Sequence, residues 1–253
     1  MAGIVAPAFQ ALLARSIDYA GMFPPASLSR ERALSNYRAY RTGENAWMLG
    51  RLVVRASELK DVPGEFDGLL SVLSETDIER AGAMETSRAL RTSKPTYCEV
   101  PVEGLDEVKR AEGFAKIRTG GVTEEAIPSV ESVASFLVAC AERRIAFKAT
   151  AGLHHPIRAV HALTYESNAP QAFMHGFLNV FLAAAFAWHG KQNVEAILGE
   201  TDPSAFRFGD AARWRDWSLT AEEVAIARSE FVHSFGSCSF EEPVDELRAL
   251  RFL

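Results

Sequence analysis

The sequence predicts one α/β domain over residues 1–253, built as a (β/α)8 barrel of the TIM-barrel type. Segments typical of buried strands alternate with segments typical of helices, and this alternation predicts a parallel sheet covered by helices. The connections are short and include no low-complexity linker. A length of 253 residues is also usual for one such barrel. An open, doubly wound parallel sheet is the alternative.

The first half of the chain gives the clearer strand signals. Ser27 or Ser29 is a favoured N-cap for the helix that follows, and Thr76 with Asp77 opens the next long helical segment. Pro95 cannot continue that helix and ends it. The expected strands cover residues 16–21, 46–54, 67–74, 96–102 and 114–118, and the expected helices cover 8–15, 30–41, 76–92 and 105–112.

The second half continues the alternation with weaker strand signals. Ser129 begins a helix whose apolar residues recur every three or four positions. Pro156 suits the first turn of another helix, and Thr220 with Glu223 forms a capping box. Strands are expected over 145–150 and 232–239, with weaker candidates over 194–198 and 206–208. Helices are expected over 129–144, after Pro156, and over 172–188, 220–231 and 244–250.

Composition argues against several classes of protein. The chain has 27 basic and 33 acidic side chains, a net charge of −6, whereas a nucleic-acid-binding protein normally carries a basic stripe. No run of about 18 apolar residues is free of polar residues, so no membrane span is expected. The N-terminus lacks the features of a signal peptide, and Cys98, Cys140 and Cys238 form no zinc pattern. We therefore expect a cytoplasmic protein with free, buried thiols.

Two lysines occur in two similar phrases, Phe114-Ala-Lys116-Ile-Arg-Thr-Gly-Gly121 and Ala146-Phe-Lys148-Ala-Thr-Ala-Gly152. Lysine is scarce in this chain, with 6 residues against 21 arginines, and it is disfavoured in strands. A strand that runs into a lysine and then a glycine turn puts an amine at the carboxyl end of the sheet, where the active sites of such barrels lie.

Adjacent parallel strands lie about 4.8 Å apart, so the two amines are expected to meet. Burial and a second nearby cation both lower the pKa of an ammonium group, and a neutral amine is a nucleophile toward carbonyls. Lys116 and Lys148 are therefore candidate catalytic residues. The alternative is that one or both pair with a carboxylate such as Asp18 or Glu99 and serve the structure.

The stretch from Lys116-Ile-Arg-Thr-Gly-Gly to Lys148-Ala-Thr-Ala-Gly resembles the paired active-site strands of class I, Schiff-base aldolases of the deoxyribose-phosphate aldolase type. The resemblance covers residues 114–153. It implies that Lys116 forms the imine and that Lys148 tunes its pKa. In that family the two strands are the sixth and seventh of eight. Here they are counted as about the fifth and sixth, with 105 residues after Lys148.

His154 and His155 directly follow the strand that carries Lys148 and precede a proline that opens a helix. Histidines at this position can act as a general acid or base, bind a metal, or donate to an anion. The alternative is a pair of loop histidines bonded to the backbone. Their spacing matches no standard zinc motif, so no metal and no cofactor is expected.

The remaining candidates are expected to contact the substrate. Arg118 can bind a carboxylate or phosphate in bidentate fashion. Asp18 and Glu99 are carboxylates in apolar strands, where they either form structural ion pairs or face the substrate. Thr119, Gly120 and Thr150 complete this set of candidates. Cys238 is a weaker candidate nucleophile because the sequence names no partner for it.

Three functions follow from these observations. The first is a lyase of aldolase character that forms a lysine imine with a small, anionic carbonyl substrate. The second is a metal-dependent hydrolase or lyase that uses His154, His155, Asp18 and Glu99. The third is a barrel that binds a ligand without catalysis. A small molecule is the expected partner in each case, no nucleic-acid or membrane partner is expected, and a homo-oligomer is compatible with the sequence.

Overall fold

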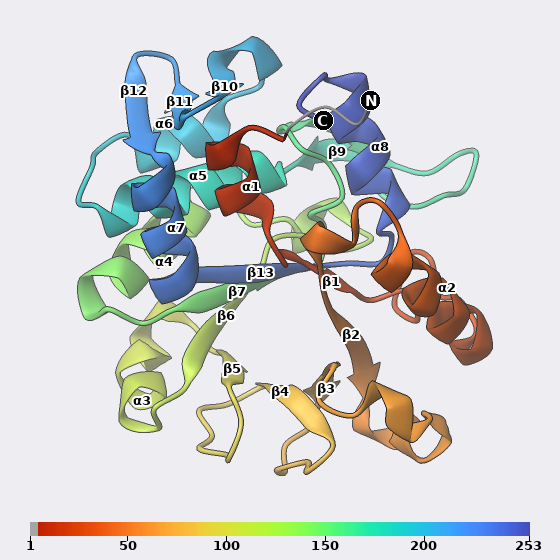
Figure 1. Cartoon of the computed structure of the whole chain (residues 1–253). Coiled ribbons are helices and arrows are strands. Elements are labelled where there is room, and N and C mark those ends of the chain that lie inside the picture. Colours follow the sequence, from red (N-terminus) through yellow and green to blue (C-terminus); the bar gives the residue numbers. More distant parts are fainter. Residues whose placement is uncertain (1–4) are drawn as a thin grey trace.

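Eight parallel strands close into a barrel in the computed structural model, which describes residues 5–253 (Figure 1). The last strand pairs with both the seventh and the first. The predicted barrel class is confirmed, and the open-sheet alternative is wrong because the sheet closes on itself. In order along the chain the strands are β1 (Ile17–Tyr19), β2 (Leu49–Arg55), β3 (Leu70–Leu73), β4 (Ala81–Thr86), β5 (Thr96–Glu99), β6 (Phe114–Arg118), β7 (Phe147–Thr150) and β13 (Val232–Ser237).

Residues 1–4 lie outside the described residues, and part of the expectation about a signal peptide falls on them. Within the part of the chain that is described, no helix combines the length and the apolar character needed to cross a bilayer.

The α-helices cover the barrel unevenly. They are α1 (Pro7–Leu13), α2 (Arg30–Thr42), α3 (Leu105–Arg110), α4 (Val130–Arg143), α5 (Phe177–Trp188), α6 (Val194–Gly199), α7 (Ala221–Glu230) and α8 (Glu241–Ala249). The four helices α4 to α7 pack together beside β6, β7 and β13 (Figure 1). Between residues 74 and 95, by contrast, loops rather than α-helices join β3 to β4 and β4 to β5.

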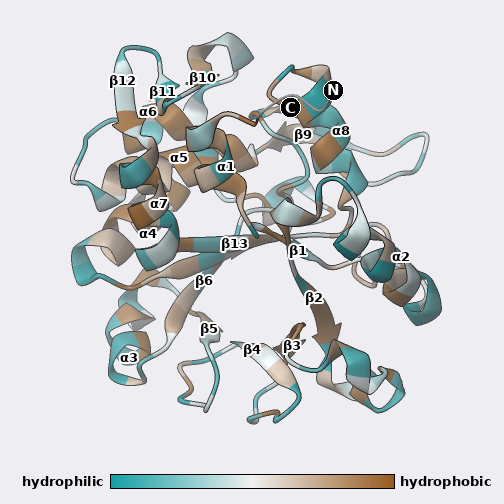
Figure 2. Ribbon diagram, in the orientation of Figure 1, coloured by the Kyte–Doolittle hydropathy of each residue, from teal (hydrophilic) through white to brown (hydrophobic). Residues whose placement is uncertain are grey.

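The apolar core is thickest between the barrel and α5. The residues of α5 and of the strands beside it are strongly apolar (Figure 2). Phe177 of α5 stacks on Phe235 of β13 with ring centroids 4.9 Å apart, and Phe147 of β7 meets Phe231 at 5.0 Å. All four rings are fully buried. Burial of such rings dominates core energetics, so this side of the barrel holds β7 and β13 firmly in place.

The expected helix over 76–92 is wrong, because this segment contains β4. Thr76 and Asp77 mimic a helix start, but residues 81–86 pair with β3 on one side and β5 on the other. Strands that are covered on both faces lose the polar–apolar alternation that identifies a strand. Because β4 adds one strand, Lys116 lies on the sixth strand of the barrel and Lys148 on the seventh, rather than on the fifth and sixth.

Three further expectations fail in the stretch after β7. The segment after Pro156 forms an antiparallel hairpin of β8 (Ala159–Ala162) and β9 (Gln171–Met174) instead of a helix. The helix expected from residue 172 begins only at Phe177. Residues 194–198 form α6 rather than a strand, because Val194, Ile197 and Leu198 share one buried helical face.

The chain between β7 and β13 is therefore a long insertion in the barrel. It contains the hairpin, α5, α6, α7 and an antiparallel sheet of β10 (Phe206–Phe208), β11 (Ala211–Trp214) and β12 (Trp217–Thr220). The 105 residues after Lys148 thus hold one further barrel strand, and the rest of that length lies mainly in this insertion.

Two glycines let the ends of β6 and β7 approach each other. A Cβ on Gly152 would lie 2.8 Å from Cα of Gly120, and Gly152 has a φ of +74°. A side chain at Gly152 would therefore collide with the neighbouring backbone and would also be held in the left-handed region.

We expect Gly152→Ala to lower the free energy of unfolding by about 2 kcal/mol or more, from left-handed strain plus overlap. Urea denaturation monitored by circular dichroism measures this loss. Gly199→Ala is the matched control, because a Cβ there meets nothing within 4 Å. Equal midpoints for the two variants would contradict the close approach.

Candidate active site

Lys116 and Lys148 lie side by side inside the barrel. The register of β6 and β7 pairs Lys116 with Lys148. Lys116 is 7% exposed and Lys148 is 0% exposed. The parallel pairing therefore brings the two amines together, as equal offsets on adjacent strands require.

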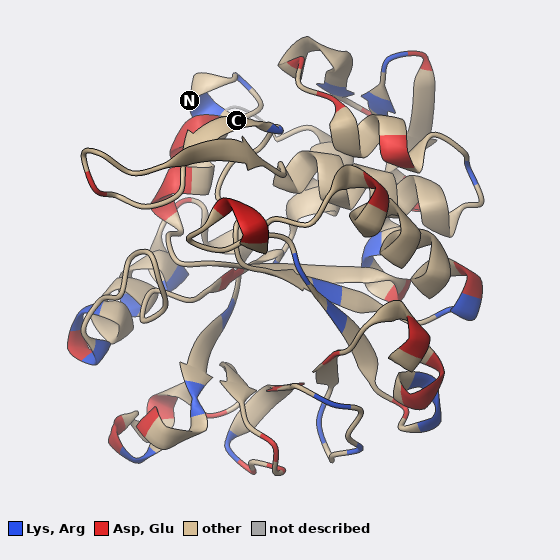
Figure 3. Cartoon of the chain, turned by 180° about the vertical axis from the view of Figure 1, so that it is seen from behind, with Lys and Arg blue, Asp and Glu red and all other residues tan. Residues whose placement is uncertain are grey.

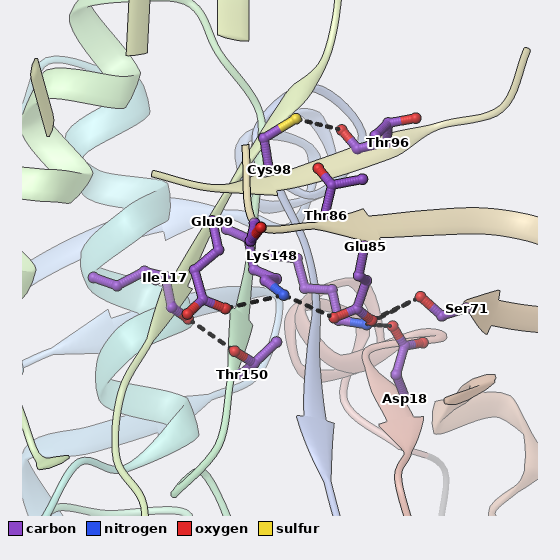
Figure 4. A network of polar contacts seen from close by, with 12 residues as sticks. Asp18, Ser71, Glu85, Thr86, Thr96, Cys98, Glu99, Ile117, Lys148 and Thr150 are labelled. Atoms are coloured by element: carbon purple, nitrogen blue, oxygen red, sulfur yellow. Dashed lines mark hydrogen bonds and ion pairs between the residues drawn. The ribbon is translucent and has the colours of Figure 1, made fainter. Parts of the chain in front are cut away.

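Glu85 of β4 contacts both lysines, and Figure 4 shows its carboxylate beside Lys148. Its Oε1 lies 2.5 Å from Nζ of Lys148, and its Oε2 lies 3.4 Å from Nζ of Lys116. A second carboxylate completes each pair: Asp18 Oδ2 is 2.6 Å from Lys148, and Glu99 Oε2 is 3.0 Å from Lys116. Two ammonium groups thus face three carboxylates.

This network fixes the charge of its most deeply buried members. Burial by itself raises the pKa of Glu85, but the charges of Lys148 and Lys116 outweigh it and lower that pKa to about 2. Burial likewise opposes the charge of Lys148, yet Asp18 and Glu85 raise the pKa of Lys148 above its ordinary value. Lys148 is consequently a permanent cation, and Glu85 a permanent anion, at neutral pH.

Polar groups behind the network hold the carboxylates in position. Asp18 accepts from the backbone N–H of Arg51 at 2.7 Å and from the Ser234 hydroxyl at 2.8 Å. Ser71 donates to Glu85 at 2.8 Å. Asp18 is 1% exposed and lies outside the cavity lining. Its oxygens are occupied by protein donors, so it anchors Lys148 and does not face a substrate.

A cavity of about 250 Å³ opens above the lysines at the carboxyl ends of the strands. Glu85, Lys116 and Lys148 form its floor. Its wall is mostly apolar and comes largely from the loop after β1, the strands β2 and β3, and the β8–β9 hairpin. The apolar wall residues include Phe23, Pro24, Pro25, Val53, Leu73, Val122, Leu163 and Met174. The space suits a small molecule with an apolar body.

The candidate binding residues divide between the cavity and its support. Arg118 and Thr150 line the cavity. Arg118 is exposed, and among residues 5–253 no carboxylate lies within ion-pair distance of it. Thr119 is buried behind the wall, where its hydroxyl donates to the carbonyl of Ala151 at 2.7 Å. Gly120 packs against the backbone of Gly152.

Both histidines line the rim and reach to α8. His154 Nδ1 lies 3.1 Å from Glu242, and His155 Nδ1 lies 2.6 Å from Glu246. Burial lowers the pKa of His154, but Cys238 and Glu242 outweigh burial and raise it to about 9. His154 is therefore protonated at neutral pH. The alternative of histidines bonded only to the backbone does not describe these contacts.

Several site residues escaped the sequence reasoning. Glu85 lay in the segment taken for a helix, so nothing marked it as an inward-facing carboxylate. Glu242 and Glu246 belong to the acidic helix α8, whose four carboxylates are red in Figure 3. The sequence predicted a helix only over 244–250, and no pattern linked its carboxylates to the two histidines. Tyr165, on the β8–β9 connection, lines the rim and donates to Glu242 at 3.0 Å.

Among residues 5–253, the donor atoms of His155, His161 and Glu246 gather within 4.8 Å of one another. The two imidazole rings are stacked in parallel, 3.4 Å apart and inclined by 4°. Imidazole nitrogens bind metals in the plane of the ring, so two parallel rings do not point at one ion. In the same part of the chain, no three of His154, His155, Asp18 and Glu99 gather in this way.

Comparison with protein-family models, with curated proteins and with solved structures finds no match to this chain.

We expect Glu85→Gln to lower the free energy of unfolding at pH 7 by about 3 kcal/mol, because it takes one of two carboxylate partners from each buried ammonium group. The folded pKa of Glu85, about 2, lies below the ordinary value of 4.5. The stabilisation is thus present above pH 4.5 and is lost as the pH falls toward 2. The difference between the urea midpoints of the two proteins should be constant above about pH 5 and should shrink as the pH falls from 4.5 to about 3.

Glu79→Gln is the matched control for this titration, because Glu79 is exposed. Its midpoint should follow that of the unaltered protein. A difference for Glu85→Gln that stays constant across the pH range would contradict the charge network.

Proposed function

We propose that this protein is a lyase of the class I aldolase kind, in which Lys116 forms an imine with a small carbonyl compound. One observation carries the proposal: Lys116 borders the cavity and has the partly exposed carboxylate of Glu99 at 3.0 Å from its Nζ. An amine at a cavity with a proton acceptor beside it is what imine formation requires.

Lys116 is the better nucleophile of the two for geometric reasons. Lys148 is completely buried, and Asp18 and Glu85 hold it at 2.6 and 2.5 Å. The contacts of Lys116 are longer, 3.0 Å to Glu99 and 3.4 Å to Glu85. The side chain of Glu99 is 35% exposed, so it can exchange protons with solvent.

The proposed steps use only these groups. Glu99 accepts a proton from the Lys116 ammonium, and the freed nitrogen attacks the carbonyl carbon to give a carbinolamine. The hydroxyl then leaves as water with a proton returned from Glu99, and a protonated imine remains. The protonated imine withdraws electrons from the bond between the α and β carbons of a β-hydroxy compound. That bond breaks as Glu99 takes the proton of the β-hydroxyl, so that an aldehyde leaves and an enamine remains on Lys116. Glu99 returns the proton to the enamine carbon, and water hydrolyses the resulting imine to free the second carbonyl product and the Lys116 ammonium.

The strand positions support the resemblance to the deoxyribose-phosphate aldolase type. In that family the two lysine strands are the sixth and seventh, and here β6 and β7 hold those places in the barrel. The long chain after Lys148 is an insertion before the last strand and leaves this arrangement intact. The likeness supports the class of reaction and leaves the substrate open.

A barrel that binds a ligand without catalysis would have both lysines saturated by carboxylates and no open cavity. The first condition is largely met here, but the second is not, because the cavity reaches Lys116. Imine formation at Lys116 therefore separates the two functions.

We expect borohydride to trap small aldehydes and ketones on Lys116, giving one reduced adduct per chain by mass spectrometry. Lys116→Met should abolish the adduct, whereas Lys60→Met, which alters an exposed lysine, should not. If a broad panel of carbonyl compounds leaves the Lys116 peptide unmodified, the lyase proposal fails.

Arg118 is proposed to bind a carboxylate of the substrate, since it is exposed and lines the cavity. We expect Arg118→Gln to weaken trapping of pyruvate or glyoxylate about tenfold or more, the value of one charge-assisted contact. Trapping of acetone and acetaldehyde should change little. An equal loss for the charged and the neutral compounds would mean that Arg118 does not recognise the anion.

A further inference from the structure

We propose that Cys238 and His154 form a second reactive centre in the cavity, a thiolate–imidazolium pair that accepts acyl groups from small esters with an apolar acyl chain. This centre lies at the rim of the cavity, and its reaction uses neither Lys116 nor Lys148. Cys238, His154, Glu242 and Tyr165 all line the cavity.

The surroundings of the sulfur favour its anionic form. Sγ of Cys238 lies 3.8 and 3.9 Å from the two ring nitrogens of His154 and 3.6 Å from the hydroxyl of Tyr165. The single proton of the Tyr165 hydroxyl goes to Glu242 at 3.0 Å, so His154 is the group that can stabilise a thiolate here.

The imidazole beside the sulfur is held in place by Glu242. Glu242, in the first turn of α8, accepts from Nδ1 of His154 at 3.1 Å. Nε2 is then left to exchange a proton at the cavity rim. Tyr165 donates to the same Glu242 oxygen at 3.0 Å and so fixes the carboxylate. A nucleophile, a base and a group that orients the base are the three parts of an acyl-transfer site.

Protonation equilibria agree with this geometry. Burial raises the pKa of the Cys238 thiol, but the hydrogen bond and charge of His154 outweigh burial and leave that pKa below its ordinary value. The charged and titratable groups that face the sulfur are His154 after β7, Tyr165 on the hairpin, Glu242 on α8 and Tyr19 on β1. Of these, only His154 carries positive charge.

The proposed reaction balances with water as the only co-reactant. The thiolate forms a bond to the acyl carbon, the bond from that carbon to the ester oxygen breaks, and His154 protonates the departing alkoxide. Neutral His154 then takes a proton from water, whose oxygen attacks the thioester carbon. The carbon–sulfur bond breaks, the carboxylic acid leaves, and the thiolate–imidazolium pair is restored. The apolar wall of the cavity beside the rim suits the acyl chain.

The experiment uses p-nitrophenyl acetate with the full chain. We expect a burst of nitrophenolate close to one equivalent per chain, and one acetyl group on the peptide that contains Cys238. Cys238→Ser should remove both, and Cys140→Ser should change neither, because Cys140 is buried in α4 outside the cavity. A burst that survives in Cys238→Ser, or no acetyl group on Cys238, overturns the proposal.

Alkylation by iodoacetamide tests the ion pair itself. At about pH 6, His154→Gln should slow alkylation of Cys238 about tenfold or more, because burial then raises the pKa of the thiol with no cation to offset it. Glu242→Gln should shift the same pH profile less and serves if His154→Gln does not fold. If the pH profile of Cys238 is that of an ordinary thiol in the unaltered protein, no ion pair exists and the proposal fails.

Discussion

The ion pairs of Lys148 are the constraint on which the rest of the site depends. A buried ammonium group without partners would cost several kcal/mol, and here the partners come from opposite sides of the barrel. Asp18 belongs to β1, Glu85 to β4 and Lys148 to β7. No two of these strands are neighbours in the barrel, so the ion pairs connect three separate parts of the ring. The polar layer therefore closes the barrel interior in the place where most barrels of this class use branched apolar side chains.

That constraint makes the two matched lysines unequal. Lys148 is held by two buried carboxylates, Asp18 and Glu85. Lys116 shares Glu85 through a longer contact and lines the cavity. The sequence suggested a second cation that would lower the pKa of its neighbour. In the structure the charge of Lys148 is largely balanced by Asp18 and Glu85, so any activation of Lys116 has to come from proton exchange with Glu99 more than from simple repulsion between ammonium groups.

The sequence predicted what depends on local pattern and missed what depends on distant contacts. Lys116 and Lys148 could be paired in advance, because equal phrases on adjacent parallel strands meet at equal heights. Glu85 could not be found, because β4 is buried on both faces and Thr76 and Asp77, shortly before it, look like the start of a helix. The partners of His154 and His155 lie on α8, some 90 residues along the chain. His154, the partner of Cys238, could not be predicted either, because the pairing of β13 with β7 brings the two residues together.

The floor and the rim of the cavity differ in charge. At the floor, the carboxylates of Glu85 and Glu99 lie beside Lys116. At the rim, the imidazole of His154 lies beside the thiol of Cys238. Lys148 is level with Ser234 of β13, and Cys238 lies four residues further along the same chain, roughly 13 Å at the usual strand rise. The lysines and the thiol thus stand at different heights along the barrel, although both line the same cavity. A compound trapped on Lys116 and an acyl group on Cys238 would share that space, so each proposed reaction is best tested in protein that lacks the other nucleophile.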